Sequence, residues 1–91
     1  MRRFLIALGG MAALAACGQS APNPYPEAAR ARFEVSCPSD SAVCVCTWDR
    51  VTRTLTYEEY EAALASFRET GNMDPRVTRA RTKCIEENPG G

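Results

Sequence analysis

The sequence has no histidine, the residue that most often acts as a general acid or base near neutral pH and most often ligates metals. We therefore expect a non-enzymatic protein with no cofactor and no bound metal. An excess of positive charge is also lacking, because eleven basic residues balance eleven acidic ones, and this leaves no electrostatic footprint for nucleic acid. No apolar run is long enough to span a bilayer.

The size of the chain and its cysteines point to an exported domain. Ninety-one residues allow one small domain, which a hydrophobic core alone stabilises only marginally. Cysteines stand at positions 17, 37, 44, 46 and 84. This density is typical of proteins that fold in oxidising compartments, where disulfides supplement the core.

The N-terminus has the layout of an export signal. Arg2 and Arg3 make a positive start, and residues 4–16 form an uncharged apolar run of about thirteen residues. A buried core helix is disfavoured because two consecutive glycines interrupt the run. We expect residues 1–16 to be a signal peptide that is removed on export.

The run ends in Leu14-Ala15-Ala16-Cys17, which resembles the lipobox of bacterial lipoproteins. The resemblance implies cleavage before Cys17 and attachment of lipid to that cysteine, which then forms no disulfide. Each buried methylene contributes about 0.8 kcal/mol, so two or three acyl chains anchor the protein permanently. In that family an aspartate after the cysteine signals inner-membrane retention, and Gly18 stands here instead. In a two-membrane envelope we therefore expect an outer-membrane anchor, with the protein facing the periplasm.

A flexible, lipidated tether is expected over residues 17–32. Three prolines between residues 22 and 26 disfavour regular structure, and ten extended residues of this kind reach about 30 Å. The segment 27–35 leaves two interpretations open: a short helix begun by Pro26, or a strand with alternating apolar side chains.

The rest of the chain, residues 33–91, is expected to form an all-α, three-helix domain stapled by disulfides. The first helix spans about 41–53, after a segment rich in N-capping residues. Thr56 and Glu59 form a capping box that begins the second helix. An aspartate–proline pair at residue 74 begins the third.

Four cysteines remain for two disulfides, and the sequence does not fix their pairing. Cys44 and Cys46 point about 200° apart on one helix, which disfavours a bond between them. We favour Cys44–Cys84, because Cys44 lies on the apolar face of its helix, together with Cys37–Cys46 on the outside. The alternative is Cys37–Cys44 with Cys46–Cys84.

The third helix carries a basic stripe of Arg76, Arg79 and Lys83, which recur at helical spacing. Such a stripe is suited to phosphate headgroups or another anionic envelope polymer. The other interpretation is that these side chains pair with the acidic residues of the second helix and serve solubility.

About half of the chain is similar to small cysteine-containing envelope proteins of Gram-negative bacteria. The similar stretch runs from Cys44-Val45-Cys46-Thr47-Trp48-Asp49 through Leu55-Thr56-Tyr57-Glu58-Glu59-Tyr60 to Cys84. This resemblance implies no particular activity. We expect an outer-membrane lipoprotein whose helical domain is an interaction or structural module for an envelope protein or anionic polymer. The alternative is a thiol-redox or Cu(I)-handling lipoprotein that uses Cys44 and Cys46.

Overall fold

The computed structural model describes residues 21–91, and this part of the chain contains four helices and no strand. The helices are α2 (Glu27–Ser36), α3 (Ala42–Thr54), α4 (Tyr57–Thr70) and α5 (Pro75–Glu87). The all-α fold class is confirmed. The three predicted helices are α3, α4 and α5, and the segment left open between helix and strand is α2. The predicted signal peptide and the lipidation site Cys17 lie outside the described residues.

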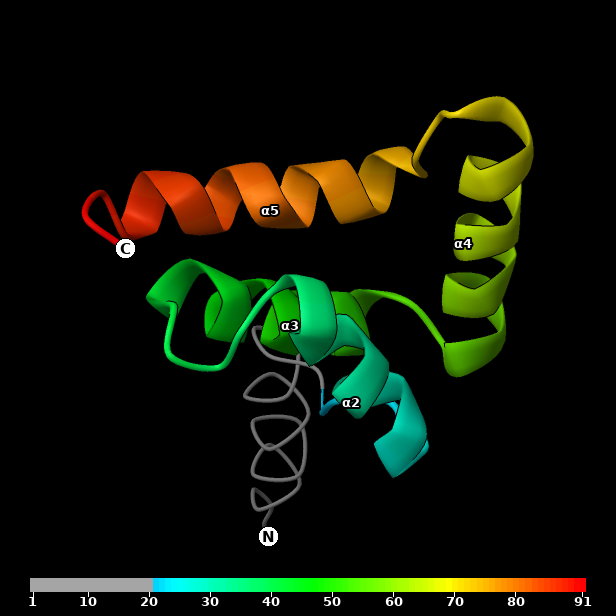
Figure 1. The fold of residues 1–91 in the computed structure, drawn as a ribbon, viewed down its shortest axis with the longest axis horizontal. Helices are drawn as coiled ribbons and strands as arrows, with labels where there is room; N and C mark the ends of the chain where they lie inside the picture. Colours follow the sequence, from blue (N-terminus) through cyan, green and yellow to red (C-terminus); the bar gives the residue numbers. More distant parts are fainter. Residues whose placement is uncertain (1–20) are drawn as a thin grey trace, which may run out of the picture.

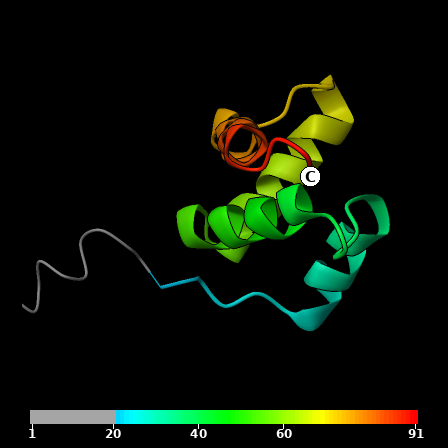
Figure 2. The same cartoon turned by 90° about the vertical axis from the view of Figure 1, so that its left-hand side faces the viewer.

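The central element of the domain is α3. Figure 1 shows α5 running alongside α3, with α4 lying across the end of both helices. Figure 2 shows α2 on the side of α3 that faces away from α5. Within residues 21–91, no helix has both the length and the apolar composition needed to cross a bilayer.

Local capping interactions set the helix boundaries. The Thr56 hydroxyl accepts a hydrogen bond from the Glu59 backbone N–H at 3.1 Å, and the Glu59 carboxylate accepts one from the Thr56 N–H at 2.8 Å. Gly71 ends α4 with a φ of 80°, a left-handed conformation that favours glycine. The Asp74 carboxylate accepts from the Arg76 N–H and begins α5. These ends agree with the capping signals in the sequence.

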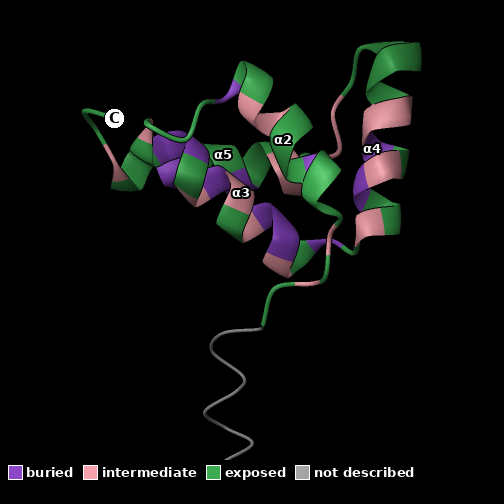
Figure 3. Cartoon of the chain, turned by 60° about the horizontal axis from the view of Figure 1, so that its bottom comes forward, coloured by how far each residue is buried: buried purple, intermediate pink, exposed green. Residues whose placement is uncertain are grey.

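The hydrophobic core is small and lies where α3, α4 and α5 meet. Its buried members are Val51, Leu55, Tyr60 and Ala80. The partly buried side chains of Tyr25, Trp48, Tyr57, Leu64 and Val77 pack against them. Figure 3 shows the buried residues concentrated on α3, whereas α2 is largely exposed. A core of this size leaves much of the stability to the disulfides.

The residues before α2 cap the C-terminal end of α3. Asn23 donates its backbone N–H and its side-chain Nδ2 to the Thr52 carbonyl oxygen, at 2.8 and 2.9 Å. The Tyr25 hydroxyl donates to the Leu55 carbonyl oxygen at 3.0 Å. Carbonyl groups at a helix end lack partners within the helix, so these hydrogen bonds satisfy groups that would otherwise need water.

The start of the packed chain therefore differs from the boundary expected from the sequence. A tether was expected over residues 17–32, but the described chain joins the fold at Asn23. Its proline and polar residues are typical of an unstructured segment. The hydrogen bonds that order it go to residues about thirty positions away, at the end of α3, and a local sequence pattern does not reveal such partners. Residues 17–20 of the expected tether lie outside the described part.

Candidate functional site

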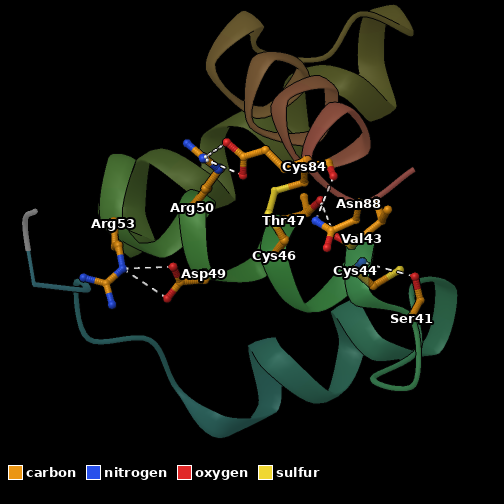
Figure 4. The surroundings of a disulfide bond; sticks show 11 residues. Ser41, Val43, Cys44, Cys46, Thr47, Asp49, Arg50, Arg53, Cys84 and Asn88 are labelled. Atoms are coloured by element: carbon orange, nitrogen blue, oxygen red, sulfur yellow. Dashed lines mark hydrogen bonds and ion pairs between the residues drawn. A yellow bond between two sulfur atoms is a disulfide. The ribbon is translucent and has the colours of Figure 1, made fainter. Parts of the chain in front are cut away.

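All four cysteines of the described chain are paired in disulfides. The bonds are Cys37–Cys44, with Cα atoms 5.3 Å apart, and Cys46–Cys84, with Cα atoms 5.6 Å apart. The favoured pairing, Cys44–Cys84 with Cys37–Cys46, is wrong, and the alternative pairing is the one observed. Figure 4 shows Cys46 and Cys84 joining α3 to α5, with Cys44 on another side of α3.

The error came from assigning the face that carries Cys44 and Trp48 to α5. In the structure Trp48 faces α2, where its ring lies 5.0 Å from that of Phe33. Cys44, one turn earlier on the same face, lies close to the end of α2 and meets Cys37. The opposite face carries Cys46 toward α5, where it meets Cys84.

The pairing also bears on the alternative dithiol site. The sulfur atoms of Cys44 and Cys46 belong to different disulfides, so these residues offer paired thiolates only after both bonds are reduced. Across residues 21–91, histidine, cysteine and carboxylate side chains nowhere gather in a group of three or more that could hold a metal ion.

A cationic cleft of about 300 Å³ lies between α3 and α5. It is lined by Arg50 and Thr54 of α3 and by Arg76, Arg79, Ala80 and Lys83 of α5. The structure thus brings together the three residues of the predicted basic stripe and adds Arg50.

Arg50 was not predicted from the sequence, because helical spacing relates residues of one helix and does not show which residue of another helix faces them. The correct disulfide pairing was the missing signal, since Arg50 lies one turn after Cys46.

Two of the four cations in the cleft are paired with carboxylates. Arg50 Nη2 donates to both carboxylate oxygens of Glu87, at 2.9 and 2.8 Å (Figure 4). Arg76 donates to both oxygens of Asp74, at 3.1 and 2.9 Å, and its Nη1 lies 3.5 Å from a carboxylate oxygen of Glu59. For Arg76, this is the pairing with the second predicted helix that the solubility interpretation expected.

The pKa values of these carboxyl groups reflect the same contacts. The hydrogen bonds donated by Arg76 lower the pKa of Asp74. The backbone N–H of Thr56 is the main cause that lowers the pKa of Glu59, and the positive charge of Arg76 adds to it. Both carboxylates therefore stay ionised and keep Arg76 occupied at neutral pH.

The other two cations of the cleft, Arg79 and Lys83, are exposed. Neither forms a hydrogen bond or an ion pair with any residue between 21 and 91. The cleft therefore contains two paired arginines and two cations that are available to an external anion.

The N-terminal segment joins the domain on the face of α3 opposite the cleft. Thr54 lines the cleft, whereas Thr52, about 200° around the helix, accepts the hydrogen bonds of Asn23 on the side of α2. The two features share the C-terminal half of α3 but lie on opposite faces of it. Comparisons with protein-family models, curated proteins and solved structures find no match to this chain.

Proposed function

We propose that this chain is the precursor of a lipoprotein of the bacterial outer membrane, anchored by lipid on Cys17, with a helical interaction module that faces the periplasm. The anchor is supported by the apolar run of residues 4–16 and by the lipobox that ends it. Two disulfides beside a small core support folding in an oxidising compartment.

The contact surface that we propose is the cationic cleft, and its partner is anionic. The observation that carries this proposal is the presence beside Arg50, in one cleft, of Arg79 and Lys83, which form no hydrogen bond or ion pair within residues 21–91. Without Arg2 and Arg3 of the leader, the mature chain has nine basic and eleven acidic residues. The cleft is thus a local concentration of positive charge on a chain with a net charge of −2.

Among anionic partners, phosphate headgroups at the surface of the anchoring membrane fit best. Five residues, 18–22, separate the lipidated cysteine from the first packed residue, Asn23, and the six residue steps between them reach about 19 Å in a polyproline-like form. The segment joins the same half of α3 that lines the cleft, so the anchor keeps the cleft within about one helix diameter, roughly 10 Å, of the attachment point. A basic residue near an anionic surface contributes about 1 kcal/mol. Two such residues favour the docked orientation by roughly 30-fold, enough to orient an anchored domain but not to replace the anchor.

The anchor is tested by replacing the proposed lipidation site. We expect Cys17→Ser to leave an uncleaved or mislocalised precursor, because the leader ends in a lipobox instead of a conventional cleavage site. Growth with a radioactive fatty acid should label the wild-type protein and not the variant. A wild-type protein that takes up no label and is released in soluble form would contradict the anchor.

The contact is tested with a photo-crosslinking amino acid in place of Thr54, which is exposed in the cleft. In native membranes we expect adducts of phospholipid mass, because the short anchored segment keeps the cations of the cleft within reach of the headgroups. The combined change Arg79→Glu and Lys83→Glu should reduce these adducts at least about tenfold, since it converts the two available cations into anions.

Arg68→Glu is the matched control for charge reversal, because Arg68 is exposed on α4, away from the cleft. It should leave the adducts unchanged. Adducts with a protein or a polymer in place of phospholipid would contradict the phospholipid as the partner of the cleft and identify the partner that binds there instead. Adducts that persist after charge reversal in the cleft would rule out the cleft as the contact surface.

A further inference from the structure

The two disulfides differ in the charge that surrounds their sulfur atoms. The Sγ atom of Cys37 lies 4.0 Å from Nη1 of Arg81. Cys44 lies in the first turn of α3, where its backbone N–H donates to the Ser41 hydroxyl and where no acidic side chain is present. A nearby guanidinium and a helix N-terminus both stabilise a cysteine thiolate. Either sulfur of this bond can therefore leave as a stabilised anion.

The other disulfide, Cys46–Cys84, is accessible from one side only. Cys84 is fully buried, with 0% of its surface exposed, and Cys46 is partly exposed. A thiolate can reach only the Cys46 sulfur, and attack there expels Cys84 as the leaving group. Within residues 21–91 no hydrogen bond reaches either sulfur of this bond, and the guanidinium of Arg50, one turn after Cys46, is held by the Glu87 carboxylate. A thiolate expelled at Cys84 would be buried without compensation, which is strongly unfavourable.

From this contrast we propose that Cys37–Cys44 is a redox-labile disulfide that undergoes exchange with a dithiol of the envelope, while Cys46–Cys84 stays closed. One thiolate of the dithiol attacks a sulfur of the bond, forms a mixed disulfide and expels the other cysteine as a thiolate, which then takes up a proton. The second thiol of the dithiol attacks the mixed disulfide. Two electrons and two protons pass to Cys37 and Cys44, and the dithiol becomes a disulfide.

The fold allows this bond to open without global unfolding. Cys37 and Cys44 are only 7% and 8% exposed, so reaction requires a local opening of the connection between α2 and α3. The residues of that connection, 38–40, are exposed. The core at the meeting of α3, α4 and α5, together with Cys46–Cys84, does not depend on this connection. Opening therefore releases the C-terminal end of α2 and leaves the rest of the domain in place.

The proposal is tested on the mature protein by brief treatment with limiting dithiothreitol, followed by alkylation and mass spectrometry of the peptides. We expect alkylation of Cys37 and Cys44 to be at least about tenfold faster than that of Cys46 and Cys84, because more stable thiolates leave faster. Opening of both bonds at one rate, or of Cys46–Cys84 first, would overturn the proposal.

The role of Arg81 has its own readout. Arg81→Gln should slow the opening of Cys37–Cys44 by roughly threefold, because it removes the cation beside the leaving sulfur. The same change should not affect Cys46–Cys84. Arg68→Gln, which removes an equal charge from α4, should leave both rates unchanged. If Arg81→Gln and Arg68→Gln behave alike, the guanidinium does not promote exchange and the electrostatic basis of the proposal fails.

Discussion

Removing the Cys46–Cys84 bond by changing both residues to alanine is expected to lower the free energy of unfolding by about 4 kcal/mol. Removing Cys37–Cys44 in the same way should lower it by about 2 kcal/mol. The difference arises because the first bond joins residues 38 apart in the sequence and the second joins residues 7 apart. Closing the longer loop removes more conformational entropy from the unfolded chain.

For a domain with so small a core, a loss of about 4 kcal/mol approaches the whole stability that such domains have. Urea unfolding followed by far-ultraviolet circular dichroism measures both double variants against the wild type. Alanine avoids placing a hydroxyl in the fully buried site of Cys84. Equal losses from the two pairs, or a larger loss from Cys37–Cys44, would show that the loop-closure argument does not describe this domain.

The helices could be predicted from the sequence because their boundaries depend on neighbouring residues. The Thr56 and Glu59 capping box, the left-handed Gly71 and the aspartate–proline start of α5 act within a few positions of each helix end. No knowledge of the rest of the fold is needed to recognise them. The start of α2 at Pro26 had the same kind of signal, but alternating apolar residues competed with it.

The disulfide pairing and the cleft could not be predicted in the same way. Both depend on how α3 is rotated about its axis relative to its neighbours. The apolar pattern identified the face that carries Trp48, but not whether α2 or α5 covers that face. For the same reason the sequence did not predict the role of Arg50. This residue of α3 contacts Glu87 of α5, and the two residues are 37 positions apart in the sequence. Helical spacing places residues on faces, and only tertiary packing decides which faces meet.

Tyr25→Ala is expected to lower the free energy of unfolding by about 2–3 kcal/mol, although the residue lies in a segment that resembles a linker. Its ring centroid lies 5.3 Å from that of Trp48, 5.4 Å from Tyr57 and 5.5 Å from Tyr60. The hydroxyl also donates to the Leu55 carbonyl oxygen. We place the loss below that of a fully buried aromatic residue because Tyr25 is only partly buried.

Tyr25→Phe is the matched control, because it keeps the ring and removes the hydroxyl. It should lose about 1 kcal/mol, the usual contribution of one hydrogen bond.

Burial, with smaller contributions from Tyr60, Glu59 and Glu58, raises the pKa of Tyr25 to about 12. An unfolded tyrosine loses its proton near pH 10, so the contribution of Tyr25 is complete below pH 10 and is lost as the pH rises toward 12. Urea unfolding at intervals between pH 8 and 12 should show a weaker decline in Tyr25→Phe than in the wild type. Identical pH profiles, or a Tyr25→Ala variant as stable as the wild type, would mean that the N-terminal segment does not cap α3.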